Sequence, residues 1–94
     1  MEVTVKFFTT LREITGKKEE KIVLNRDATV KDLLNTLSKK YGKAFVDYVF
    51  EKSNAPRPFL QFLIDGVSIT NLQDFQTKLR NGCKVAIIPP VGGG

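Results

Sequence analysis

The sequence lacks the residues that most often carry chemistry inside a protein. It contains no histidine, which excludes Ser-His and Cys-His nucleophilic catalysis and any zinc site that needs a histidine ligand. Its single cysteine, Cys83, excludes an internal disulfide and cannot complete a zinc finger. We expect Cys83 to be a small buried apolar residue in a strand, with a reactive thiol as the alternative.

Long apolar segments are also missing. Unbroken apolar stretches are only a few residues long, too short to span a bilayer. Residues 1–4 lack the basic-then-apolar pattern of a signal peptide. We therefore expect a cytoplasmic protein with no membrane partner.

Acid/base and phosphate-binding patterns are equally scarce. Glu19 and Glu20 fall in an expected hairpin turn, where a solvated pair is the better interpretation than a catalytic dyad. Asp65-Gly66 is typical of a tight turn. The terminal glycines precede no helix, so they form no phosphate-binding loop. The sequence thus predicts no catalytic residue, no metal site and no bound cofactor within the fold.

The net charge is +5, but the basic residues are interleaved with acidic ones along the chain. The only local basic cluster is Lys39, Lys40 and Lys43. A solvated surface explains this pattern. Because no nucleic-acid-binding signature accompanies the charge, nucleic acid is not the expected partner.

The residues that are present predict one globular domain. The chain has 94 residues, 41% hydrophobic and 27% charged, which is ordinary globular composition. Alternating or β-rich patterns bounded by turn residues predict strands over 3–8, 20–24, 59–64, 67–69 and 83–88. A helical turn is expected over 9–14 and a short amphipathic helix over 45–50. A second short helix, capped by Thr70 or Asn71, is expected to carry Leu72, Phe75 and Leu79 on one face.

The clearest helix begins after Thr29. The Thr29 hydroxyl can cap the first turn, and Asp32 stands three residues on, as in a capping box. Gly42 is the residue expected just past the helix end. The face that would pack on the sheet is apolar at helical spacing: Val30, Leu33, Leu34, Leu37 and Tyr41.

This order of elements predicts an α+β fold, with one main helix packed across a mixed sheet. It is the order of a ubiquitin-like β-grasp, in which the first and last strands lie side by side and parallel at the sheet centre. Phe8 and Ile88 would then be neighbours. We expect residues 1–90 to form this domain and residues 91–94 to form a flexible C-terminal glycine tail.

The glycine tail is where we expect the chemistry. Glycine is costly to order, so Gly92, Gly93 and Gly94 contribute nothing obvious to folding; a tail without function is the alternative. Pro89 and Pro90 end the last strand. From Pro89 to Gly94 an extended chain reaches about 20 Å, enough to deliver a carboxylate into a partner's active site. There, ATP and magnesium could convert the carboxylate to an acyl-adenylate.

Three segments resemble the small, sulfur-carrying subunit of molybdopterin synthase, a family that shares the β-grasp fold with ubiquitin and the thiamine sulfur carrier. They are residues 3–8 (VTVKFF), residues 11–16 (LREITG) and residues 85–94 (VAIIPPVGGG). The sequence departs from the family pattern in four ways: it has a third glycine, Gly92; its stretch from Ala44 to Pro58 is longer than in compact members; it reads Asn81-Gly82-Cys83 before the last strand; and it has a basic net charge.

The resemblance implies that a ubiquitin-activating-like enzyme adenylates the Gly94 carboxylate with ATP and magnesium. The carboxylate then becomes a thiocarboxylate, and the tail donates sulfur inside the large synthase subunit during molybdenum cofactor synthesis. Gly93 and Gly94 are the residues to which this role transfers. The protein would be a carrier, the non-catalytic subunit of a sulfurtransferase, rather than an enzyme.

Two other functions stay open. Some relatives are joined to target-protein lysines as ubiquitin-like modifiers, which requires the same activated glycine end. A plain β-grasp binding domain would need no tail at all.

Strand alternation adds a docking hypothesis. If Val3, Val5 and Phe7 face the helix, Phe8 and Ile88 face the opposite side, beside the base of the tail. With Val91 they would form an apolar docking patch for the partner. Cover by residues 53–58 or 59–64 is the alternative.

Overall fold

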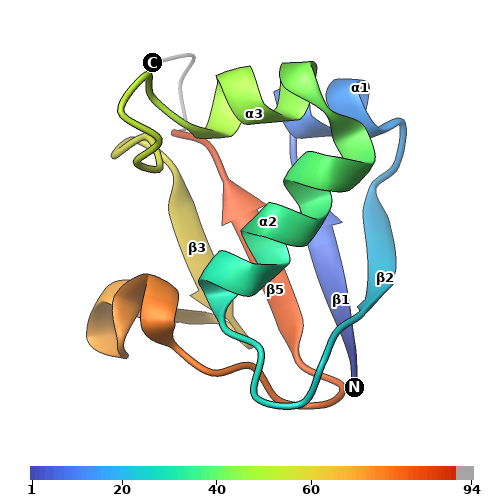
Figure 1. The fold of residues 1–94 in the computed structure, drawn as a ribbon, viewed down its shortest axis with the longest axis vertical. Helices are drawn as coiled ribbons and strands as arrows, with labels where there is room; N and C mark the ends of the chain where they lie inside the picture. The colour runs from blue at the N-terminus through green and yellow to red at the C-terminus, as the bar shows by residue number, and fades with distance from the viewer. Residues whose placement is uncertain (91–94) are drawn as a thin grey trace.

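The structure of the protein, a computed structural model, describes residues 1–90. Figure 1 shows a sheet covered on one face by helices. The strands are β1 (Glu2–Phe7), β2 (Glu19–Val23), β3 (Gln61–Ile64), β4 (Val67–Ser68) and β5 (Lys84–Ile88). The helices are α1 (Thr10–Thr15), α2 (Val30–Tyr41) and α3 (Lys43–Val49), followed by two 3-10 turns, η1 (Ile69–Asn71) and η2 (Asp74–Gln76).

The five strands form one mixed sheet in the order β2-β1-β5-β3-β4. β1 and β5 run parallel at its centre, with Phe7 opposite Ile87. β1 pairs antiparallel with β2, and β5 pairs antiparallel with β3. Together with α2 lying across the sheet, this topology confirms the predicted ubiquitin-like β-grasp (Figure 1).

The main helix forms as its sequence predicts. The Thr29 side chain accepts a hydrogen bond from the Asp32 backbone N–H, and the Asp32 carboxylate accepts one from Thr29 N–H. This reciprocal cap satisfies two donors that a helix start would leave unpaired. Gly42, at φ 76°, ends the helix in a backbone conformation that favours glycine.

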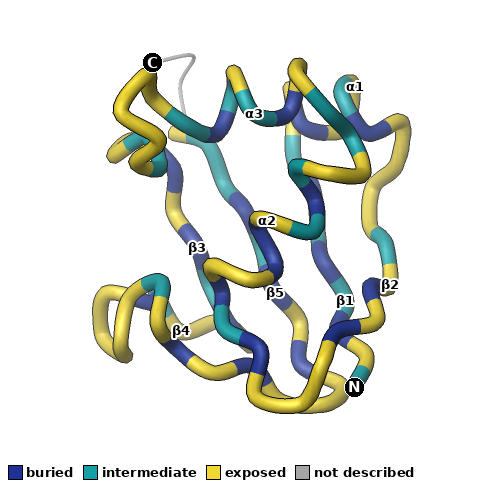
Figure 2. The backbone as a smooth tube through the Cα atoms, in the orientation of Figure 1, coloured by how far each residue is buried: buried dark blue, intermediate teal, exposed yellow. Residues whose placement is uncertain are grey.

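The core lies between α2 and the sheet (Figure 2). Alternate residues of β1 and β5 are fully buried, and Cys83 is buried as expected. Other fully buried side chains come from α2 and α3: Val30, Leu33, Leu37, Phe45 and Val49. The predicted apolar face of α2 is confirmed, although Tyr41 at its end is only half-buried.

The predicted short helix after residue 70 is wrong. The chain there makes η1 and η2 instead, and Ser68 caps the first of them by accepting a hydrogen bond from Thr70 N–H. Thr77 is already extended and its hydroxyl accepts from Gln73 N–H at 2.9 Å. This turn separates the residues expected to share a face: Leu72 is 45% exposed, whereas Leu79 is 4% exposed.

The strand boundaries also differ from the prediction. β2 starts one residue early, at Glu19, and β3 starts at Gln61 rather than at residue 59. The segment before β3 is held in a turn, in which Leu60 N–H donates to the Arg57 carbonyl at 3.2 Å. Local turn bonds therefore outweigh the β-rich sequence of residues 59–60.

Candidate functional site

The base of the C-terminal tail is fixed by β5, the strand between β1 and β3. Ile88, the last residue of β5, is paired with Gln61 of β3. Pro89 and Pro90 follow, and because proline has no backbone N–H to donate, they end the ladder. β5 thus leaves the middle of the sheet at the end where α3 and the loop after it lie (Figure 1).

The face of the sheet turned away from α2 is apolar near this point. Strand alternation places Leu63, Ala86 and Ile88 on that face, and all three are half-buried. Phe8 directly follows β1 and is half-buried too. We call Phe8, Leu63, Ala86 and Ile88 the root patch. The predicted positions of Phe8 and Ile88 fit this geometry; their role in docking stays a prediction.

Arg12 covers part of the root patch. Its guanidinium carbon lies 5.4 Å from the centroid of the Phe8 ring, within the range of a cation–π contact. Its Nε donates to the Phe7 carbonyl at 2.9 Å, which satisfies a backbone acceptor at the end of β1. Phe8 is therefore held in place by Arg12 of α1, a contact that the sequence analysis did not predict. The sequence feature that could have predicted this contact is the position of Arg12, about one helical turn after the apolar strand.

The tail itself, Val91 with Gly93 and Gly94, lies outside the described residues. The predicted chemistry at these positions thus rests on sequence.

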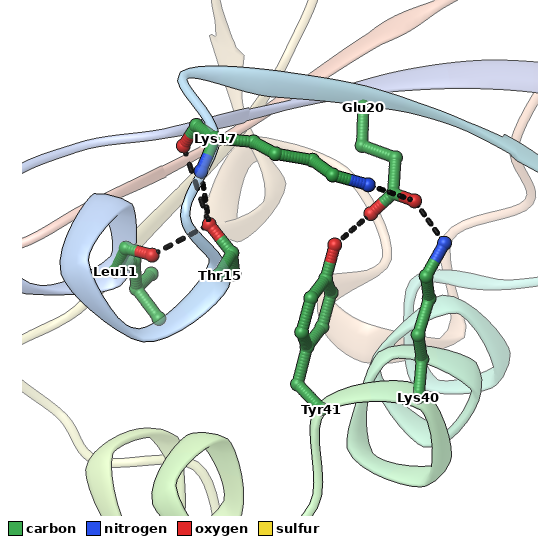
Figure 3. A network of polar contacts seen from close by, with 6 residues as sticks. All are labelled: Leu11, Thr15, Lys17, Glu20, Lys40 and Tyr41. Atoms are coloured by element: carbon green, nitrogen blue, oxygen red, sulfur yellow. Dashed lines mark hydrogen bonds and ion pairs between the residues drawn. The ribbon is translucent and has the colours of Figure 1, made fainter.

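On the face of the sheet that packs against α2, polar side chains form a network of hydrogen bonds and ion pairs around Glu20. Figure 3 shows Lys17, Lys40 and the Tyr41 hydroxyl converging on the Glu20 carboxylate, whose side chain is only 8% exposed. Lys17 Nζ lies 3.1 Å from Glu20 Oε2. The interpretation of Glu20 as a solvated turn residue is wrong, because α2 brings two donors to it from a distant part of the chain.

This network shifts two pKa values. Burial raises the pKa of Glu20, but hydrogen bonds from Lys40, Tyr41 and Lys17 outweigh that effect and lower it to about 2. Burial and the neighbouring Glu20 carboxylate raise the pKa of Tyr41 above its ordinary range. Tyr41 also packs edge-on against Phe7, with ring centroids 6.1 Å apart. The network therefore ties α2 to both β2 and β1 and has a structural role.

Neither a metal site nor a membrane span is found among the described residues. Within residues 1–90, no group of three or more His, Cys, Asp or Glu residues is arranged to hold a metal ion. In the same part of the chain, no helix is long and apolar enough to cross a bilayer.

Comparison with known proteins decides the family. A model described as the ThiS family matches residues 5–94. The chain belongs to the ThiS family. Small archaeal modifier protein 3 of Haloferax volcanii is 33% identical over 94 residues, covering 100% of both chains.

Two solved structures agree with this assignment. Small archaeal modifier protein 1 of Methanosarcina acetivorans superposes with a TM-score of 0.83 at 33% identity, covering 99% of this chain and 96% of the other. A candidate molybdopterin converting factor, subunit 1, from Pyrococcus furiosus gives 0.73 at 29% identity, covering 96% and 98%. This member of the ThiS family is thus a small ubiquitin-like carrier or modifier protein, and the resemblance to the sulfur-carrying subunits is confirmed at the level of the family.

Proposed function

We propose that this ThiS-family protein carries sulfur on the carboxylate of Gly94 and serves as the small subunit of a molybdopterin synthase. One observation supports this proposal most: the central strand β5 ends at Ile88 and is followed directly by Pro89-Pro90, and the family match continues through the glycines to residue 94. A glycine thread on a rigid base is suited to entering a narrow partner channel, because it has no side chain to obstruct it.

The proposed reaction begins in a ubiquitin-activating-like partner that holds ATP and magnesium. A Gly94 carboxylate oxygen attacks the α-phosphorus of ATP, and pyrophosphate leaves. A sulfide-level sulfur nucleophile then attacks the carbonyl carbon of the acyl-adenylate, and AMP leaves. The product is a thiocarboxylate, which the large synthase subunit uses as its sulfur source. The protein supplies the reacting group and its delivery, and the partners supply catalysis.

Docking would orient the tail. A short glycine segment alone gives little affinity, because ordering glycine on binding costs conformational entropy. The root patch, with Phe8 and Ile88 beside the departing chain and Val91 next along it, offers apolar area for that purpose.

A second candidate function is protein modification. It is favoured by the names of the relatives at 33% identity, which are small archaeal modifier proteins. The activation step would be identical, and a lysine amine of a target protein would displace AMP. Target lysines that carry a glycine remnant after proteolysis would identify this outcome, and a C-terminal thiocarboxylate would identify the first.

Glycine variants test the proposal. Gly93→Leu keeps the length of the tail but adds a side chain next to the reacting group. We expect activation by the cognate adenylating enzyme to fall by about a hundredfold, the scale of a misplaced reacting group, with an unchanged melting temperature. The readout is intact mass after incubation with that enzyme, ATP and a sulfur donor.

The matched control removes one glycine. Deleting any of Gly92, Gly93 or Gly94 gives the same ending, Pro-Pro-Val-Gly-Gly, so this variant should still be activated. Activation of Gly93→Leu at the wild-type rate would contradict the threading mechanism.

A further inference from the structure

The face of the sheet turned away from α2 carries three lysines around Thr4, together with Glu2 and Glu19. Thr4 of β1 is paired on one side with Lys21 of β2 and on the other with Lys84 of β5. Lys6 lies two residues further along β1, on the same face. Neighbouring strands are about 5 Å apart, so the Lys21 and Lys84 backbones are about 10 Å apart, with Thr4 between them. We call Lys6, Lys21 and Lys84 the lysine strip.

The side-chain ammonium groups of the lysine strip form no ion pair within residues 1–90, although the Lys84 backbone N–H donates to Asp65 Oδ1 at 2.9 Å. The ion pairs in that part of the chain join Lys17 and Lys40 to Glu20, Lys43 to Asp47, and Arg80 to Asp65. Glu19 stands opposite Lys6 in the register, yet the two side chains form no ion pair. Lys21 and Lys84 are separated by Thr4, and no ion pair within residues 1–90 explains why the three lysines share one face.

The strip is continuous with the root patch. Lys6 is the register partner of Ala86, and Ala86 is also paired with Leu63. Lys84 and Ile88 are four residues apart on β5, about 13 Å in an extended strand. One surface thus has an apolar part at the end where β5 leaves the sheet and a lysine-rich part further from that end.

We propose that the lysine strip docks an acidic segment of the protein partner that activates the terminal carboxylate. The proposal rests on the function proposed above and names the chemistry of the partner's surface. Complementary charge mainly sets the encounter rate and the orientation of a complex. An acidic segment on the strip would place the apolar contact at the root patch and align the tail with the partner's channel.

The same surface is less suited to nucleic acid. Single strands bind on exposed aromatic rings that stack with bases, and the one aromatic residue of the root patch, Phe8, lies under Arg12. A phosphate backbone on the lysines would leave the aliphatic half of the face, Leu63, Ala86 and Ile88, in water. A protein partner can cover both halves.

The test compares two charge-reversed proteins with the same net charge. One carries Lys21→Glu and Lys84→Glu. The matched control carries Lys31→Glu and Lys39→Glu, two exposed residues of α2 that form no ion pair in the described residues. ATP–pyrophosphate exchange with the cognate adenylating enzyme gives KM and kcat for each protein at low and high salt.

We expect the strip variant to raise KM about tenfold with kcat within about twofold, since reversing two exposed charges acts on encounter. Its KM should also respond less to salt than the wild-type KM. The control should change KM less than about twofold. If the charge-reversed protein folds poorly, Lys21→Gln with Lys84→Gln takes its place, because this pair adds no carboxylate beside Glu19 and Asp65. Its KM should increase by a factor between those of the control and the charge-reversed protein.

Equal KM values for the strip variants and the control would overturn the proposal while leaving the proposed function intact. A wild type that is neither activated nor bound by the enzyme would overturn both. Binding of a single-stranded oligonucleotide that is lost in Lys21→Glu/Lys84→Glu, with KM unchanged, would assign the strip to nucleic acid and would likewise overturn the proposal.

Discussion

The two faces of the central sheet use the same residue types in opposite ways. On the helix face, Lys17 and Lys40 are bound to Glu20, and the apolar residues of β1 and β5 are fully buried. On the other face, the side chains of the lysine strip form no ion pair within residues 1–90, and the root patch is half-buried. The first face satisfies its groups internally and so stabilises the fold. On the second face, water solvates the lysine side chains, which leaves them available to a partner.

Two adjacent phenylalanines test this comparison with the largest expected effect. Phe7 is 0% exposed on the helix face, so Phe7→Ala should cost about 3–5 kcal/mol of unfolding free energy. Phe8 is half-buried under Arg12, so Phe8→Ala should cost about 1 kcal/mol. Urea denaturation measures both. If Phe7→Ala does not fold, Phe7→Leu should still cost more than Phe8→Leu.

The order of the two effects should reverse when binding to the adenylating enzyme is measured, with Phe8→Ala affecting binding more than Phe7→Ala does. Phe8→Ala should weaken binding to the adenylating enzyme, because it removes apolar area from the root patch. Equal stability losses for the two alanine variants would mean that Phe8 belongs to the core, and the distinction between the faces would fail.

The Glu20 network gives the next largest effect. Its hydrogen bonds lower the pKa of Glu20 from 4.5 to about 2, so the stabilisation is present above pH 4.5 and is lost as the pH falls toward 2. Glu20→Gln should therefore cost about 2 kcal/mol at neutral pH. The difference from wild type should shrink as urea denaturation is repeated at lower pH.

Asp47→Asn is the matched control for Glu20, because Asp47 pairs with Lys43 on the exposed surface. Exposed pairs contribute little, so its denaturation midpoint should not move. A Glu20→Gln loss that stays constant between pH 7 and pH 3 would contradict the charge-based account.

The smallest expected effect concerns the lysine strip. Lys84→Gln should change the unfolding free energy by less than about 0.5 kcal/mol, whereas Lys40→Gln should cost about 1 kcal/mol through the network. A large loss for Lys84→Gln would show that the strip stabilises the fold, which its lack of ion pairs argues against.

Local sequence signals were enough for much of the fold. The capping box of Thr29 and Asp32 sets the start of α2, and Gly42 marks its end. Alternation in β1 and β5 correctly predicted which residues face α2, because a strand with one buried face must alternate. The parallel pairing of these strands put Phe8 and Ile88 near the base of the tail.

The failures have non-local causes. Glu20 has an unremarkable local sequence, and its partners Lys40 and Tyr41 come from the far end of α2. The expected helix after residue 70 is lost because Thr77 turns the chain so that Lys78 pairs with Thr29. Alternation with buried residues in each strand shows which face each lysine lies on. Only the register of the three strands shows that the lysines of the strip lie near one another.

The central claim is that the C-terminal carboxylate of Gly94 is the reacting group and that the folded domain positions it for a partner enzyme. The most direct measurement is the intact mass of the full chain after incubation with its adenylating enzyme, ATP and a sulfur donor. The account predicts that one C-terminal oxygen is replaced by sulfur, with fragmentation placing the change on Gly94. A mass that stays unchanged, with an enzyme shown to be active on another carrier, would contradict it.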